Sequence, residues 1–187
     1  NNFEVELLDI NGDGHLDAVF ANRHHDGNQV WLGNGDGTFT ETSQSPLAKR
    51  DTNDLALADL DGDGQLDVVF AEENAGTAWM GNGDGSFSPT PQVPLGDAST
   101  QAVALADLDG DGHLDAVVAN GSTGPDDFNT VWLGNSSGVF TSTGQDLGSA
   151  NQAVALGDVD GDGKLDAVFA HASNGNPVYS GNGDGTF

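Results

Sequence analysis

The apolar residues of this chain lie in short runs, separated by turns rich in glycine, aspartate and asparagine. In the third quarter of the sequence such runs occupy residues 102–106, 116–119 and 130–133, and residues 139–140 open a further extended segment. Runs of this length without helical spacing indicate β-strands, and Asn-Gly turns between them indicate tight hairpins. We therefore predict an all-β fold, with four short strands in each such segment.

One nine-residue pattern, Asp-x-Asp/Asn-Gly-Asp-Gly-x-x-Asp, occurs four times and starts at Asp9, Asp59, Asp107 and Asp158. The copies are 50, 48 and 51 residues apart. A second pattern, an aromatic residue followed by a Gly-rich turn and Phe, keeps the same period at residues 31–39, 79–87, 132–140 and 179–187. Such a period is typical of propellers and solenoids. We predict one repeat domain, 1–187, of four-stranded antiparallel β-propeller blades at residues 1–50, 51–98, 99–149 and 150–187, with the last strand of the fourth incomplete.

The repeated pattern presents oxygen atoms at alternate positions, with glycines that permit sharp turning, which is the chemistry of a calcium loop. Four loops predict about four Ca²⁺ ions, each held by four side chains and by the backbone oxygen of the seventh residue. The predicted ligand residues are Asp9, Asn11, Asp13, His15 and Asp17; Asp59, Asp61, Asp63, Gln65 and Asp67; Asp107, Asp109, Asp111, His113 and Asp115; and Asp158, Asp160, Asp162, Lys164 and Asp166.

These loops differ from EF-hands, which need a bidentate Glu at the twelfth position and flanking helices. The twelfth position is apolar in every copy: Phe20, Phe70, Val118 and Phe169. Oxygen ligands favour calcium over zinc, which prefers His and Cys. The alternative interpretation is that the loops are solvated hairpins without an ion.

The calcium loop between two apolar β runs, repeated about every fifty residues, resembles the FG-GAP/VCBS-type repeat of integrin-like β-propellers and of many secreted bacterial proteins. The Phe-Gly and Gly-Ala-Pro elements that name the repeat are absent, so the integrin subfamily is not expected. Propellers of this kind usually carry six to eight blades, and this chain supplies four. The fold is thus expected to be a closed four-bladed ring or part of a larger propeller or assembly.

The charge is strongly acidic, with 30 Asp and Glu against 4 Lys and Arg and a formal net charge of -26. Four bound divalent ions would reduce this to about -18. The chain lacks the clustered cations that nucleic-acid binding needs and any apolar run of membrane-spanning length. Calcium loops are filled more readily outside cells, which favours secretion. No signal peptide is seen, so we expect a mature chain or a part excised from a longer protein.

In a propeller blade the calcium loops and the Gly-rich turns share one end, and the opposite end carries the connections that differ between repeats. Those segments are residues 22–27, 72–76, 120–129 and 171–176. They are the expected place for ligand specificity, although solvated loop tips are an equal alternative. The candidate ligand-binding residues are Arg23, His24, His25, Glu72, Asp126, Asp127, Phe128 and His171, of which the two neighbouring histidines could also hold a transition metal.

Two further features bear on packing. The aromatic residues at one repeat position, Trp31, Trp79, Trp132 and Tyr179, are expected to pack between blades rather than to form a sugar-binding row. In the first repeat Glu4 and Glu6 stand where later repeats have alanine. A buried carboxylate is costly, so we predict that the outer face of the first blade is exposed or meets a polar partner.

The leading functional hypothesis is an extracellular, calcium-stabilised recognition or adhesion module that binds a glycan or a protein through its variable loops. A second hypothesis is a structural unit whose open blade edges associate with other copies. A third is a part of a secreted polysaccharide-active enzyme, but no paired general acid and base recur outside the calcium loops. We therefore expect no catalytic residues.

Overall fold

The computed structural model describes residues 2–23, 27–47, 50–88, 94–95, 99–121, 128–171 and 175–187. Its described part contains four antiparallel sheets. The first contains β1 (Asn2–Leu8), β2 (Asp17–Asn22), β3 (Gln29–Gly33) and β4 (Phe39–Glu41). The second contains β5 (Thr52–Ala58), β6 (Asp67–Glu72), β7 (Gly76–Trp79) and β8 (Pro94–Leu95). The third contains β9 (Thr100–Ala106), β10 (Asp115–Asn120), β11 (Thr130–Leu133) and β12 (Thr141–Asp146).

The fourth sheet contains β13 (Asn151–Gly157), β14 (Asp166–His171) and β15 (Val178–Tyr179). In every sheet the strands are hydrogen-bonded in chain order, as in a meander. This confirms the predicted all-β fold of antiparallel sheets, of which the fourth has three strands among the described residues. Among the described residues there is no helix long and apolar enough to cross a membrane.

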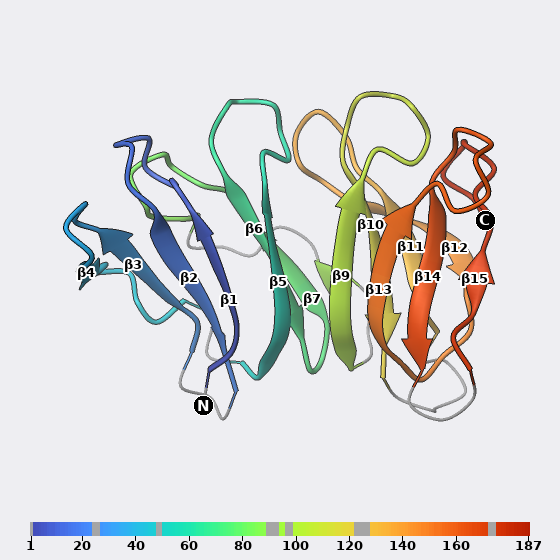
Figure 1. Cartoon of the computed structure of the whole chain (residues 1–187), viewed down its shortest axis with the longest axis horizontal. Coiled ribbons are helices and arrows are strands. Elements are labelled where there is room, and N and C mark those ends of the chain that lie inside the picture. Colours follow the sequence, from blue (N-terminus) through green and yellow to red (C-terminus); the bar gives the residue numbers. More distant parts are fainter. Residues whose placement is uncertain are drawn as a thin grey trace.

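The four sheets stand in a row, with the first sheet and the last at its opposite ends (Figure 1). Contacts between neighbouring sheets run through their first strands, because β1 packs against β5, β5 against β9 and β9 against β13. Three apolar clusters fill the spaces between successive sheets. The hydrophobic core of the molecule therefore lies between the blades, since a single sheet has no second layer of its own.

The second strand of each inner blade supplies both neighbouring clusters, because successive side chains of a strand point to opposite faces. In β6, for example, Val68 and Phe70 join the cluster shared with the first blade, whereas Val69 and Ala71 join the cluster shared with the third. All six residues of β6 and of β10 are buried. This explains the near-continuous apolar runs of these strands in the sequence.

The aromatic residues of the third strand pack between blades, as predicted. Trp79 is 7% exposed, and Trp132 and Tyr179 join the inter-blade clusters as partly buried members. The Tyr179 ring meets Phe169 edge to face, with 5.8 Å between the ring centroids. Trp31 is half-buried because it belongs to the first blade, whose outer face has no neighbour among the described residues.

Glu4 and Glu6 of β1 lie toward the second blade. The expectation that they make the outer face of the first blade polar is therefore wrong. Oε2 of Glu6 accepts a hydrogen bond from the backbone N–H of Leu57 at 3.2 Å. Asp54, the second-blade equivalent of Glu4, likewise accepts from the next blade, from the N–H of Val103 at 3.1 Å. The outer face of the first blade is exposed, as predicted, but it carries Val5 and Leu7 instead.

Candidate metal loops and a polar cavity

Each repeated aspartate loop joins the first strand of a blade to its second, and its own carboxylates hold it in shape. In the third blade Asp107 accepts from the N–H groups of Gly110 and Gly112 at 2.7 and 3.0 Å. Asp111 accepts from the N–H of His113 at 2.8 Å. The two glycines have φ values of +79° and +90°, a region that other residues rarely adopt. These hydrogen bonds and glycine conformations therefore give the loop its shape without a bound ion.

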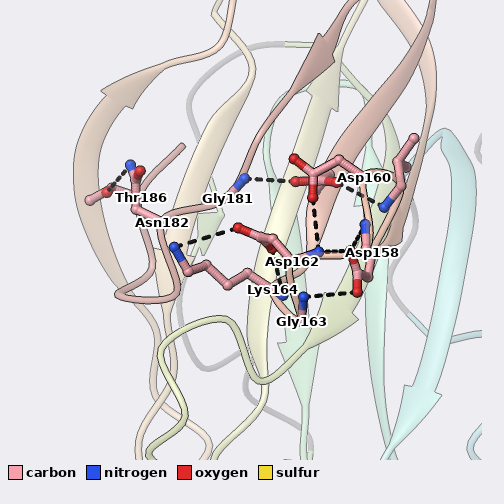
Figure 2. Close-up of polar contacts among 11 residues, drawn as sticks. Asp158, Asp160, Asp162, Gly163, Lys164, Gly181, Asn182 and Thr186 are labelled. Carbon is pink, nitrogen blue, oxygen red and sulfur yellow. Dashed lines mark hydrogen bonds and ion pairs between the residues drawn. The ribbon is translucent and has the colours of Figure 1, made fainter.

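Three of the loops gather acidic oxygen atoms at one point, with ligand atoms within 4.8 Å of one another. The residues involved occupy the first, third and ninth positions: Asp59, Asp61 and Asp67; Asp107, Asp109 and Asp115; Asp158, Asp160 and Asp166. In the first loop the third position is Asn11, which offers an amide oxygen in place of a carboxylate. Oxygen atoms alone, carrying several negative charges, fit a hard divalent cation. Figure 2 shows the loop of the fourth blade, with Asp158 and Asp160.

The remaining predicted ligands lie in the same loops but outside these acidic clusters. The aspartate at the fifth position accepts a hydrogen bond from the backbone N–H of the seventh residue. The N–H of Lys164 donates to Oδ1 of Asp162 at 2.9 Å, and the N–H of Gln65 donates to Oδ1 of Asp63 at 2.8 Å. The Nζ of Lys164 also lies 3.6 Å from Oδ2 of Asp162. Metal binding stays a prediction at every one of these positions, including Asp13, Asp111, His15 and His113.

The ninth aspartate of each loop has a structural role that sequence reasoning missed. Asp115 is fully buried, and its two oxygens accept from the N–H of Leu108 and of Gly134, each at 2.8 Å. The carboxylate thus ties the loop to the end of the third strand. The same pair of bonds occurs in all four blades, at Asp17, Asp67, Asp115 and Asp166.

Burial raises the pKa of Asp67 and Asp115, and the nearby acidic side chains of the same loops raise it further, while the backbone N–H groups act in the opposite direction. The loops therefore hold negative charges that repel one another. A divalent cation between them would offset this repulsion.

The aspartate loops and the Gly-rich turns lie at the same end of the blades, which we call the loop end. A methyl group on Gly35 would come within 2.4 Å of the His15 ring, and one on Gly83 within 1.9 Å of Oε1 of Gln65. In Figure 2 the turn with Asn182 and Thr186 lies beside the fourth loop. This confirms the predicted sharing of one end and leaves the opposite end, the variable end, to the differing connections.

A polar cavity opens at the variable end, next to the starts of the four inner strands. Its volume is about 580 Å³, and a smaller hollow of about 300 Å³ shares Arg23, Asn53 and Gln101 with it. The larger cavity is lined by residues of all four blades: Glu4, Arg23, Asn53, Asp54, Gln101, Ala102, Gln152 and Ala153. Amide, guanidinium and carboxylate groups in one concave site are suited to a polar ligand.

The floor of this cavity is held by hydrogen bonds between blades. Nε of Arg23 donates to Oδ1 of Asn53 at 2.7 Å, and Nδ2 of Asn53 donates to the carbonyl of Thr100 at 2.7 Å. One side chain of the first blade is thereby linked through the second blade to the third. Burial, with a smaller contribution from Glu4, raises the pKa of Asp54 in spite of the N–H groups that it accepts. Arg23, Asn53 and Asp54 are therefore held by hydrogen bonds, whereas Glu4 and Gln152 are exposed.

The predicted ligand-binding residues meet different outcomes. Arg23 lines the cavity. His171 is half-buried, and its N–H donates to Oδ1 of Asn176 at 3.1 Å. Phe128 is half-buried, and its carbonyl accepts from the side chain of Asn120. Four candidates lie outside the described residues: His24, His25, Asp126 and Asp127.

Glu72 corrects the expectation of an exposed loop contact, because the structure buries it completely. Its Oε2 lies 3.3 Å from Oγ1 of Thr77, which donates to it, and 3.9 Å from Nε of Arg50. Burial raises the pKa of Glu72 to about 7. The residue belongs to the packing beneath the variable end.

Asn53, Gln101 and Gln152 are cavity residues that the sequence reasoning missed. They occupy the same position in successive repeats, two residues before the apolar Leu55, Val103 and Val154. Side-chain amides at one repeat position in three blades, next to the variable connections, are the pattern that could have identified them.

Comparisons with known proteins agree with this architecture. The sequence model of the FG-GAP-like repeat matches residues 9–70, 59–118 and 107–169. No curated protein matches the chain. A solved structure of an Agrocybe aegerita lectin, described as specifically recognising non-reducing terminal N-acetylglucosamine, is 27% identical over 100% of this chain and 50% of its own, with a TM-score of 0.64.

A second solved structure, BBS1N in complex with ARL6DN, is 13% identical over 98% of this chain and 55% of its own, with a TM-score of 0.60. At this identity the likeness concerns the fold alone. The chain spans about half the length of both solved chains. Because the family match extends over residues 9–169 and the sheets have the meander topology of propeller blades, the chain belongs to the FG-GAP-like repeat family.

Proposed function

We propose that this chain is an extracellular recognition module without catalytic activity, which is stabilised by calcium at the loop end and binds a glycan at the variable end. The observation that carries the proposal is the polar cavity, because it joins residues of all four blades at the end where the repeats differ. A repeat protein can vary this end without disturbing the packing between its blades.

The proposal of calcium rests on the donor set. The acidic clusters contain oxygen donors, and calcium accepts six to eight oxygen ligands in flexible geometry. Magnesium demands a stricter octahedron and retains more water. Calcium ions bound in the four loops would add positive charge at the end of the blades where the aspartates gather.

The proposal of a glycan rests on the cavity chemistry. Gln101 and Gln152 offer amides, Glu4 and Asp54 offer carboxylates, and Arg23 offers a planar donor. Such groups match the hydroxyl and acetamido groups of a sugar, which need both donors and acceptors. The Agrocybe aegerita lectin, whose description names N-acetylglucosamine, supports this class of ligand.

The test is binding to an immobilised glycan array in calcium, followed by titration calorimetry with each glycan that binds. Gln101→Ala and Gln152→Ala remove amides from the cavity, and each lost hydrogen bond of about 1–1.5 kcal/mol weakens binding about tenfold. The matched control is Gln29→Ala, which removes an amide on β3 outside the cavity. Absence of glycan binding, or equal losses in the cavity variants and the control, would contradict the proposed function.

A further inference from the structure

The four aspartate loops share one sequence pattern but differ in net charge. With histidine counted as neutral, the second and third loops each contain four aspartates and no cation, which gives a net charge of -4. The first loop contains three aspartates, because Asn11 occupies its third position. The fourth loop contains four aspartates and Lys164. The first and fourth loops therefore each have a net charge of -3.

Asn11 takes the place that an aspartate has in the other loops. Its Oδ1 accepts from the N–H of Asp13 at 2.9 Å. In the third loop Oδ1 of Asp109 accepts from the N–H of Asp111 at 3.0 Å. The second side-chain atom differs, because Nδ2 of Asn11 is a donor and lies 3.1 Å from Oδ2 of Asp13. The first loop thus keeps the hydrogen bond of its third position but lacks the carboxylate.

The Lys164 side chain lies between the fourth loop and the neighbouring Gly-rich turn. Its Nζ is 3.6 Å from Oδ2 of Asp162 (Figure 2). A methyl group on Gly183 would lie 3.2 Å from Cδ of Lys164, so the apolar part of the side chain lies against the turn. The positive charge of Lys164 is therefore placed beside the carboxylate of a predicted calcium ligand.

Gln65 is the neutral counterpart of Lys164 in the second loop. Its Nε2 donates to Oδ2 of Asp63 at 3.3 Å, and its side chain lies against Gly83 of the neighbouring turn. Gln65 and Lys164 thus occupy the same repeat position and approach the same oxygen atom of the fifth-position aspartate. They differ by one unit of charge.

The backbone of the loops does not differ in the same way. In all four loops the N–H of the sixth residue donates to the first aspartate, and the N–H of the seventh residue donates to the fifth. The affinity of a calcium loop depends on the number of its charged ligands and on its rigidity. For solvent-exposed loops, Coulomb's law predicts a change of roughly fivefold to tenfold in affinity for each unit of charge close to a divalent ion.

We propose that Asn11 and Lys164 lower the calcium affinity of the first and fourth loops, so that the chain binds two ions tightly and two weakly. This inference rests on the proposed calcium binding and concerns how the four sites differ. As the calcium concentration falls, the first and fourth loops lose their ions while the second and third still retain theirs. The stabilisation by calcium is thereby graded rather than all-or-none.

A residue-specific calcium titration tests the proposal. Each loop has one reporter, the N–H of its sixth residue, which donates to the first aspartate at 2.9–3.0 Å; the reporters are Gly14, Gly64, Gly112 and Gly163. Nitrogen–proton correlation NMR in calcium-buffered solutions at neutral pH follows all four amides. The signals of Gly64 and Gly112 should reach their midpoints at roughly fivefold to tenfold lower free calcium than those of Gly14 and Gly163.

Two substitutions should convert a weak loop into a tight one. Lys164→Gln introduces the residue of the second loop, which keeps a donor near Asp162 and removes the positive charge. Asn11→Asp introduces the third-position residue of the other loops. Each should move the midpoint of its own loop to roughly fivefold to tenfold lower calcium. The other three loops of the same molecule are the internal control and should be unchanged.

The reverse substitutions should weaken a tight loop. Gln65→Lys places an ammonium group in the second loop, and Asp61→Asn removes a carboxylate from its acidic cluster. Both should raise the midpoint of Gly64 by the same factor. The matched control is Asp146→Asn, which makes the same change of net charge at an exposed position on β12, paired with the start of β11 at the variable end. It should leave all four midpoints unchanged.

The possible failures of this proposal and of calcium binding itself are distinguishable. One common midpoint for the four native amides, or midpoints that Lys164→Gln and Asn11→Asp leave unchanged, would overturn the two affinity classes but preserve the proposed calcium binding. If calcium shifts none of the four amides, both proposals are wrong. The proposed glycan is tested separately, because none of the aspartate loops lines the polar cavity.

Discussion

Both ends of the blades carry polar side chains, but the hydrogen bonds of these side chains have different partners at the two ends. At the loop end, aspartates repeat in every blade and bond to their own backbone, as Asp107 does with Gly112. At the variable end, the polar groups bond across blades, as Arg23 does with Asn53. The loop end therefore stabilises each blade locally, whereas the variable end depends on the packing of several blades.

Removing divalent ions should give the largest effect, because it acts on the loop end of all four blades. A bound ion contributes about 2.7 kcal/mol when its free concentration is a hundredfold above its Kd, so four sites contribute about 11 kcal/mol. For a chain of this size that sum corresponds to a fall in Tm of roughly 20–40 °C. Calorimetry in calcium, in magnesium and in a chelator measures it. The same Tm in calcium and in chelator would mean that the loops are solvated hairpins.

The next effect should come from the ninth aspartate, and it should persist without metal. Asp115→Ala leaves two buried N–H groups, those of Leu108 and Gly134, without their acceptor. Each costs about 1–3 kcal/mol, so the free energy of unfolding in chelator should fall by about 2–6 kcal/mol.

The control for this prediction is Asp111→Ala, which removes an exposed carboxylate from the same loop. Water can replace it, so the change in chelator should be within about 0.5 kcal/mol. Urea unfolding measures both variants. Equal losses in the two variants would show that the two hydrogen bonds of the buried Asp115 contribute no more to stability than the exposed carboxylate of Asp111.

A pH-dependent effect should come from Glu72 beneath the variable end. Its pKa is about 7 in the folded chain against an ordinary 4.5, so the unfolded chain releases its proton first as the pH rises. The contribution of Glu72 to stability is present below pH 4.5 and is lost as the pH rises to about 7. The loss is on the order of 3 kcal/mol.

Glu72→Gln removes this titration and keeps a side chain of similar shape. The variant should match the native chain near pH 4.5 and exceed its free energy of unfolding progressively up to about pH 7. Urea unfolding at several pH values gives the difference between the two chains, which cancels the titration of the other acids. Parallel pH profiles would show that the carboxylate is not held in a buried site.

The repeated parts of the molecule were predictable because their causes are local. The Asp107 loop, the adjoining strands and the Gly-rich turns follow from residue spacing, from glycine conformation and from alternation. The faces of the first blade were not predictable to the same degree. Counting along the repeat identified Glu6 as an unusual residue, but its hydrogen bond to Leu57 depends on the position of the second blade.

The candidate site divides in the same way. The acidic clusters around Asp61, Asp109 and Asp160 bring together residues close in sequence, so the pattern alone predicted them. The cavity joins Glu4, Asn53 and Gln152, which are far apart in the chain, and only the packing of four blades brings them together. The burial of Glu72 was also missed, because its loop position indicates solvent while the neighbouring strands exclude it.

By itself, the sequence determined the repeat, the all-β blades and the acidic loops, because these depend on interactions within about ten residues. The tertiary structure alone decided which side of each strand meets which blade and where the polar groups converge. Those properties depend on contacts between blades that lie about fifty residues apart. For this reason the buried Glu72 is no ligand contact, whereas Asn53, Gln101 and Gln152, at the starts of the first strands of three blades, line the cavity.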